Sequence, residues 1–391
     1  MAEARLYFDW NAGAPMKAAA RARLVELLGR PGNGSSVHAE GRAARAVVEG
    51  ARRSVARLCG AEAKGVTFCS GGTEAANTVL TPDWTLFGKP YRLDRLLVSA
   101  VEHPAVARGG RFPPESVEAI PVDGNGVVDL GALERRLAEL AAAGERALVS
   151  VMMANNETGV VEPIADVARI ARAHGALVHS DVVQAAGKLP IDVEALGLDV
   201  VTLSAHKIGG GQGVGAIVRG RNGFAFTPLV TGGGQESWAR AGTENVAAIG
   251  AFGVAAEASL AELEIMADVA ARRDRVAALI RAIAPDAVVF AEEAPRLANT
   301  LCFAVPGIAA ETAVIAFDLA GVALSSGSAC SSGKVTASPV LQAMGVDPAL
   351  VKSGLRVSIG AETSDEEIAT FDLRARNVFA AMKKQHGTAA A

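Results

Sequence analysis

Residues 198–219, LDVVTLSAHKIGGGQGVGAIVR, form the stretch from which the fold and the site of this chain can be worked out. An apolar run from Leu198 to Leu203 predicts a buried strand, and Ser204, His206 and Lys207 follow it directly. Five glycines then predict a flexible turn before a second apolar run. A lysine held between a buried strand and a glycine turn loses its proton more easily when desolvated, and a neutral amine forms a Schiff base with an aldehyde.

One strand earlier, the apolar run from Ala176 to Ser180 ends on Asp181, and Gln184 follows three residues later. An aspartate at the carboxyl end of a strand in an open α/β sheet points into the crevice where such sheets bind ligands. Pyridoxal phosphate (PLP) needs a lysine for its aldehyde and a carboxylate for its ring nitrogen. Taken singly, Lys207 is more simply a solvated loop lysine and Asp181 a helix N-cap. Together, on adjacent strand ends, they favour the cofactor site.

Other polar residues follow other predicted strands. The strand at 66–69 leads into a glycine turn that contains Gly72 and Thr73 and opens a helix, an arrangement that suits a phosphate but is also common where nothing binds. His103 follows the strand at 96–100, and Asn156 follows the strand at 147–153. Since the carboxyl ends of parallel strands meet at one edge, we expect these residues near Asp181 and Lys207.

Strands alternating with helices predict an α/β fold with a mostly parallel sheet over residues 16–260, the large cofactor-binding domain. From about residue 285 the elements become shorter, and we expect residues 1–15 and 261–385 to form a smaller, mainly C-terminal α+β domain. The tail at 386–391 is predicted to be disordered.

Composition narrows the class of protein. The 391 residues carry 38 basic and 42 acidic side chains, a net charge of −4, with no long run of one sign, which argues against nucleic acid or a membrane surface as a partner. The first ten residues lack the form of a signal peptide, and the apolar run from Val246 to Ala256 is too short to span a bilayer, so we expect a cytoplasmic protein. Four scattered cysteines predict neither a disulfide framework nor a protein-made metal site.

Two residues of the predicted small domain stand out. Cys330 lies in a serine- and glycine-rich stretch, SSGSACSSG at 325–333, and an accessible loop cysteine is a candidate nucleophile, although a cysteine of no consequence fits the composition equally well. Arg356 falls in a predicted buried strand, where an arginine requires a carboxylate, either an internal acid or that of a substrate.

These motifs resemble the cysteine desulfurases, the class V aminotransferase-like group of fold type I PLP enzymes, and most closely the type that serves iron–sulfur cluster assembly. The similarity extends from Tyr7 to Gly360. It is carried by SAHK at 204–207, NNE at 155–157, GGGQE at 232–236, RAGTEN at 240–245 and SSGSAC at 325–330.

The resemblance implies a role for each candidate. Lys207 would bind the PLP aldehyde, Asp181 the ring nitrogen, and His103 would stack on the ring and exchange protons. The ring hydroxyl and the phosphate would be held by Asn156, Gln184, Gly72, Thr73, Ser204 and His206, with Thr243 reaching in from a partner subunit of a homodimer. Asn33 and Arg356 would bind the carboxylate of L-cysteine. Cys330 would take the sulfur as a persulfide, leave alanine, and pass the sulfur to an acceptor or iron–sulfur scaffold protein.

The chain departs from the family pattern at Gly13 and Ala14, where threonines are usual, and at Thr231, where histidine is usual. Two other functions stay open at this point. A selenocysteine lyase or another class V aminotransferase-like enzyme would keep Lys207 and Asp181 without needing Cys330. A scaffold or regulator of sulfur transfer would keep the fold without turnover.

Overall fold

The computed structural model describes the backbone of residues 5–220, 223–327 and 337–389, and the side chains as far as Met382. Its largest element is a seven-stranded sheet, with strands in the order β2-β10-β9-β8-β7-β5-β6. These strands are β2 (Val66–Cys69), β10 (Gly215–Arg219), β9 (Val200–Ser204), β8 (Leu177–Asp181), β7 (Ala147–Ser150), β5 (Arg95–Ser99) and β6 (Val117–Ile120). Only β10 runs antiparallel to its neighbours within this sheet. The predicted α/β fold with a mostly parallel sheet is therefore confirmed.

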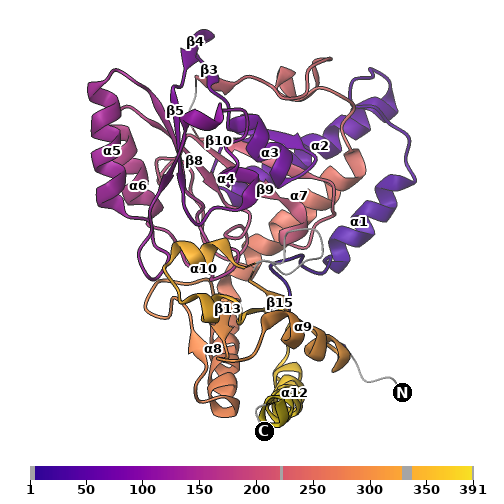
Figure 1. The fold of residues 1–391 in the computed structure, drawn as a ribbon. Helices are drawn as coiled ribbons and strands as arrows, with labels where there is room; N and C mark the ends of the chain where they lie inside the picture. The colour runs from indigo at the N-terminus through magenta and orange to yellow at the C-terminus, as the bar shows by residue number, and fades with distance from the viewer. Residues whose placement is uncertain (1–4, 221–222, 328–336, 390–391) are drawn as a thin grey trace.

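Helices cover both faces of this sheet (Figure 1). One face packs on helices α2 (Ala39–Leu58), α5 (Leu130–Ala142), α6 (Ile164–Ala173) and α7 (Val246–Ala261). The other face packs on α3 (Gly72–Val79) and α4 (Pro104–Ala107). Strands covered on both faces are mostly apolar and carry few charges, and β9, VVTLS, is accordingly buried at every position.

Helix α7 is apolar on all sides because it is enclosed. It packs against α1 (Ala18–Leu28) and α2, and the approach is so close that a Cβ on Gly253 would lie 2.6 Å from the Cα of Ala51. The stretch Val246–Ile283 has the length and composition of a membrane span, yet 56% of its most apolar window is buried inside the protein. That burial is what a core helix requires.

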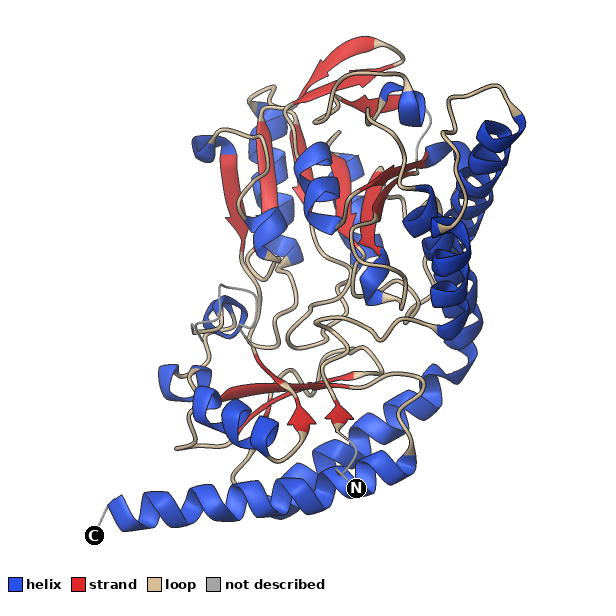
Figure 2. Ribbon diagram, turned by 90° about the vertical axis from the view of Figure 1, so that its right-hand side faces the viewer, coloured by secondary structure: helices blue, strands red, loops and turns tan. Residues whose placement is uncertain are grey.

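A smaller four-stranded antiparallel sheet lies below the large sheet in Figure 2. Its order is β12 (Val288–Val289), β13 (Thr300–Ala304), β16 (Gly354–Ser358) and β15 (Ser325–Ser326). The pair β1 (Leu6–Tyr7) and β14 (Val322–Ala323) lies beside it, with helices α8 (Met266–Ile283), α9 (Ala310–Leu319), α10 (Pro339–Ala343), α11 (Pro348–Val351) and α12 (Asp365–Ala389). A second core, which includes Phe8, Phe303 and Phe371, joins these strands to α8, α9 and α12.

Two features differ from the sequence analysis. Helix α12 continues to Ala389, where a disordered tail was predicted from residue 386, because the alanine, lysine and glutamine residues near its end favour the helix once it has begun. A three-stranded antiparallel sheet of β3 (Asp83–Leu86), β4 (Lys89–Arg92) and β11 (Phe224–Phe226) was not predicted. Its strands are short: β3 and β4 are partly exposed and lack an apolar run, and β11 has only three residues.

Candidate active site

A cavity of about 330 Å³ lies at the carboxyl ends of β8 and β9. It is closed by the segment at residues 11–12 and by Arg356 of β16. Ten of the residues predicted from the sequence line it, and these are Gly72, Thr73, His103, Asn156, Asp181, Gln184, Ser204, His206, Lys207 and Arg356. The strand-end argument therefore brought together residues that are more than 280 positions apart in the chain.

Lys207 lies in the turn that follows β9 and reaches across to the amino-terminal segment. Its Nζ donates hydrogen bonds to the carbonyl oxygens of Asn11, at 2.6 Å, and Ala12, at 2.9 Å. Asn11 is itself held from the small sheet, since its Nδ2 donates to Thr300 Oγ1 at 2.9 Å and its backbone N–H donates to Ser358 Oγ at 2.9 Å. The amine therefore sits in a fixed position at the pocket wall.

Asp181 is the last residue of β8 and faces the same cavity. Its Oδ1 accepts the backbone N–H of Val183 at 2.8 Å. Burial raises the pKa of Asp181 to about 6, while the Val183 N–H and the charge of Lys207 act in the opposite direction. A positively charged ring nitrogen next to this carboxyl group would favour its ionised form further.

His103 caps α4, because its Nδ1 accepts the backbone N–H of Ala105 at 3.1 Å. Burial, and then the charge of Lys207, lower the pKa of His103, so its ring is neutral at pH 7. With Nδ1 used as an acceptor, the ring proton lies on Nε2. His103 therefore brings a flat, uncharged ring and one N–H donor to the cavity.

The start of α3 forms the end of the cavity that suits a phosphate. Gly71 and Gly72 lead into the helix, and a Cβ on Gly72 would lie 3.2 Å from Val183 and 3.6 Å from Ser204, so the backbone approaches its neighbours closely there. Ser204 Oγ lies 2.8 Å from Nδ1 of His206. Burial lowers the pKa of His206 to about 4, with a further contribution from Lys207, so this ring is also neutral. Neutral donors and free helix N–H groups together suit a dianion.

Arg356 is almost fully buried, with 3% of its side chain exposed. Its Nη2 donates to Asp9 Oδ1 at 2.7 Å and its Nη1 to the Asn156 carbonyl oxygen at 2.8 Å. Within the described part of the chain, its Nε has no hydrogen-bond partner. The internal acid predicted as one alternative therefore exists, and one buried N–H is still left for a further acceptor.

Two predicted residues, Thr243 and Asn33, do not line this cavity. Thr243 is exposed and lines a separate cavity of about 250 Å³ with Cys69 and Ser70. Asn33 lies in an exposed loop, where its Oδ1 accepts the backbone N–H of Ser35. Cys330 lies outside the described residues.

Asn11 is a site residue that the sequence analysis did not identify. Its side chain contacts Thr300 and Asn299, about 288 positions away, and its carbonyl oxygen accepts from both Lys207 and Gln184. No periodic pattern or local motif marks a backbone carbonyl as a ligand. Its place in the turn after Asp9 is the only local signal.

The groups that line the cavity fit PLP. Lys207 offers an amine to the aldehyde, Asp181 an acid to the ring nitrogen, and His103 a neutral ring to the cofactor face. The start of α3 and Ser204 offer donors to the phosphate. The free N–H of Arg356 is left for a substrate group rather than for the cofactor.

Comparison with known proteins agrees with this arrangement. Residues 6–371 match the family described as aminotransferase class-V. A cysteine desulfurase of Cereibacter sphaeroides is 40% identical over 370 residues, 93% of each chain. The cysteine desulfurase IscS of Dictyoglomus turgidum is 34% identical over 368 residues, 93% of this chain and 91% of that protein. The X-ray structure of a NifS-like protein from Rickettsia africae superposes with a TM-score of 0.86 at 32% identity, covering 96% of this chain and 99% of that one.

These findings confirm the resemblance identified from the motifs, and with it PLP as the cofactor of this enzyme. The chain belongs to the aminotransferase class-V family.

Proposed function

We propose that this protein is a cysteine desulfurase, which converts L-cysteine to L-alanine and keeps the sulfur as a persulfide on Cys330. The observation that carries the proposal is the Nε of buried Arg356, which has no hydrogen-bond partner among the described residues and lies in the same cavity as Lys207 and Asp181. A cofactor site with a spare guanidinium N–H suits a small amino acid, because the carboxylate can accept that N–H while the amine reaches the cofactor. The cysteine desulfurases among its relatives point to the same substrate.

Each residue of the pocket has a separate role in the proposed reaction. When bound, PLP supplies an aldehyde for amines and a ring that stores an electron pair. The Lys207 amine, held by the Asn11 and Ala12 carbonyl oxygens, is placed to move the α-proton of the substrate. His103 can deliver a proton from Nε2, because its Nδ1 is engaged by Ala105. Arg356 and, by the family resemblance, Asn33 orient the carboxylate.

Sulfur transfer is proposed to occur on Cys330. Its thiolate forms a bond to the substrate sulfur and the carbon–sulfur bond breaks. The electron pair of that bond stays with the carbon side, which takes up a proton and leaves as alanine. The other cysteines are poor candidates: Cys59, Cys69 and Cys302 are buried, and burial raises the pKa of the Cys59 and Cys69 thiols to about 12, so little thiolate is present.

The two ends of the segment that carries Cys330 support its role, because both approach Glu157, the neighbour of Asn156 in the cavity wall. Ser338 Oγ donates to Glu157 Oε2 at 2.5 Å, and a Cβ on Gly327 would lie 2.8 Å from the same oxygen. Gly327 and Ser338, the described residues on either side of that segment, therefore lie close to the cavity wall.

A homodimer and a sulfur-acceptor protein belong to the same proposal. The segment at 229–243 exposes Leu229, Val230 and Trp238, and Trp238 has 70% of its surface open. Exposed apolar groups of this kind favour coverage by a partner, and a second copy would account for Thr243 lying outside the cavity of its own chain. The acceptor of the persulfide sulfur is proposed to be an iron–sulfur scaffold or a related carrier in the cytoplasm.

The test is sulfide and alanine release from L-cysteine in the presence of a thiol reductant. The wild-type protein is expected to release both in equal amounts, and Cys330→Ala neither, although it retains the visible absorbance of the cofactor. Cys59→Ala, at a buried cysteine remote from the cavity, serves as the matched control and should release sulfide. Sulfide release by Cys330→Ala at the wild-type rate would reject the role of Cys330. Retained cofactor without sulfide from the wild-type protein would reject the reaction.

A further inference from the structure

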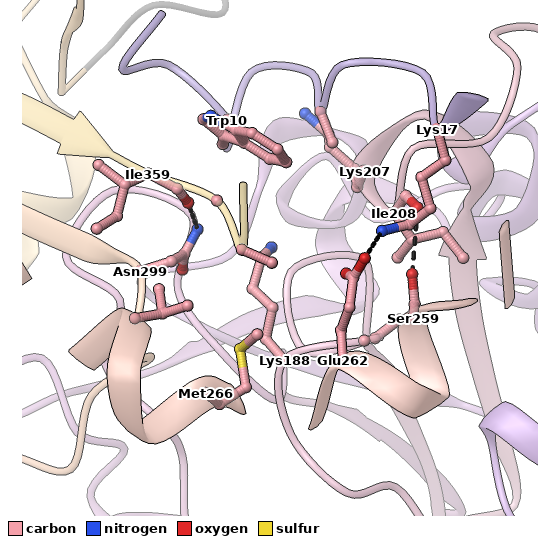
Figure 3. A pocket seen from close by; sticks show the side chains of 16 residues that line it. Trp10, Lys17, Lys188, Lys207, Ile208, Ser259, Glu262, Met266, Asn299 and Ile359 are labelled. Carbon is pink, nitrogen blue, oxygen red and sulfur yellow. Dashed lines mark hydrogen bonds and ion pairs between the residues drawn. The ribbon is translucent and has the colours of Figure 1, made fainter. Parts of the chain in front are cut away.

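A second, partly buried lysine lies next to the cofactor cavity. Lys188 follows β8 by seven residues and, with Lys207, lines a narrow cavity of about 40 Å³ between the two cores (Figure 3). Its Nζ donates to the backbone oxygen of Gln184 at 3.0 Å and to Gln184 Oε1 at 3.1 Å. Both described partners of this amine therefore belong to one residue, which also lines the cofactor cavity.

Lys188 differs from the other lysine of the same narrow cavity. Lys17 forms an ion pair with Glu262, and Figure 3 shows this pair on the far side of the cavity. Lys188 instead faces neutral oxygens and lies close enough to Lys207 and Arg356 to feel their charges. Burial first, and then these two cations, lower the pKa of Lys188 to about 7. A partly buried amine that has no carboxylate partner among the described residues is unfavourable unless its hydrogen bonds compensate for the loss of water.

The hydrogen bonds of Gln184 indicate what Lys188 does. Its Nε2 donates to the Asn11 carbonyl oxygen at 3.0 Å, the same oxygen that accepts from Lys207 at 2.6 Å. A carbonyl oxygen only accepts, and the Lys188 amine donates to Gln184 Oε1. Lys188 therefore holds the oxygen of the Gln184 side-chain amide, and the Asn11 carbonyl oxygen holds its nitrogen. In this orientation the amide nitrogen lies toward the cavity. Among the described residues, the Asn11 carbonyl oxygen is the one acceptor of that nitrogen, so its second N–H can serve a bound group.

We propose that Lys188 is a positioning residue of the cofactor site, which holds the Gln184 side chain so that it presents an N–H donor, and not its carbonyl oxygen, to the bound cofactor. The cofactor group that benefits is its ring oxygen, which accepts hydrogen bonds. The inference rests on the proposed role of Gln184 in cofactor binding and does not depend on which amino acid is the substrate. Without Lys188, only the Asn11 carbonyl oxygen would favour this orientation of the amide.

The experiment uses the holoenzyme without L-cysteine and measures the rate of PLP release and the pH titration of the visible cofactor band. Lys188→Met, which keeps the length of the side chain without its donors, is expected to release PLP roughly 3- to 10-fold faster, the equivalent of one hydrogen bond. The pH midpoint of the band should rise in this variant. The fixed Gln184 donor and the Lys188 cation both disfavour protonation of the cofactor, and the substitution removes both effects. Lys188→Arg, which only donates, should restore both readouts.

Lys17→Met is the matched control, a partly buried lysine of the same cavity that pairs with Glu262 instead of Gln184. It is expected to lower the melting temperature without moving the cofactor band. The second control is a double-mutant cycle: in a Gln184→Ala background, Lys188→Met should change PLP release less than twofold, because Lys188 acts through Gln184. An equal effect in both backgrounds would overturn the proposal.

Lys188→Gln keeps the proposal testable if the methionine variant does not fold. It retains a polar group that both donates and accepts, and so no longer selects one orientation of Gln184. A folded Lys188→Gln with an unshifted band and wild-type PLP release would overturn the proposal. Neither the PLP release rate nor the pH titration uses L-cysteine. Both can therefore test the role of Lys188 even if the protein has no desulfurase activity.

Discussion

Replacement of Arg356 by lysine is expected to weaken the binding of L-cysteine while sparing a substrate without a carboxylate. Arg356 is 3% exposed, its two terminal nitrogens are engaged by Asp9 and Asn156, and its Nε is the one left without a described partner. Lysine keeps the charge but loses the planar fork, so the substrate carboxylate loses a charge-assisted hydrogen bond. Such a bond contributes about 1.5–3 kcal/mol, and the dissociation constant should rise roughly 10- to 150-fold.

The assay is a titration of the visible cofactor band with L-cysteine and with cysteamine, which has the same amine and thiol and lacks the carboxylate. For cysteamine the Arg356→Lys change should be less than twofold. Asp9→Asn is the matched control, because it removes the ion-pair partner of Arg356 and leaves the guanidinium in place. It should lower the melting temperature and retain L-cysteine binding. Equal losses for both compounds in Arg356→Lys would refute the assignment of this N–H to the carboxylate.

Two further predictions concern buried carboxyl groups. Burial raises the pKa of Glu157 from 4.5 to about 7, so the folded protein holds more protons than the unfolded chain between these values and loses stability as the pH rises through them. Glu157→Gln should therefore match the wild-type protein near pH 5 and exceed it by about 3 kcal/mol near pH 8 in urea unfolding, and identical pH profiles would contradict this. Glu236 binds Arg52 through both oxygens, at 2.7 and 2.9 Å, and Glu236→Gln should cost about 3 kcal/mol by leaving that arginine without its buried partner. Glu26, which pairs with Arg23 and Arg30 at the surface, provides the comparison, and Glu26→Gln should shift the urea midpoint far less. An equal shift would show that burial does not increase the contribution of the Arg52–Glu236 pair to stability.

The parts of the fold that could be predicted are those in which one physical constraint dominates. Strands buried on both faces must be mostly apolar. The strands of the sheet could therefore be predicted from apolar runs such as Leu198 to Leu203. Parallel strands place their carboxyl ends at one edge, and so Asp181, His103 and Lys207 could be expected together.

The rest depended on contacts between distant segments. The carbonyl oxygens of Asn11 and Ala12 hold Lys207, and a backbone atom has no sequence signature. The role of Lys188 rests on the position of a side chain that local pattern describes only as a lysine after a glycine. Thr243 and Asn33 were assigned by family resemblance, and neither enters the cavity of its own chain.

The anchoring of the amino-terminal segment has a consequence for how the enzyme is made. The residues that hold Lys207 are themselves held from the end of the chain, since the Asn11 N–H bonds Ser358, 347 positions later, and the Trp10 ring fills the space beside Gly360, where a Cβ would lie 2.3 Å from it. The cofactor pocket therefore cannot be complete until nearly the whole polypeptide has left the ribosome. A protein interrupted between Lys207 and Thr300 would carry the lysine, the aspartate and the histidine of the site and still lack the residues that hold Asn11 and close the cavity.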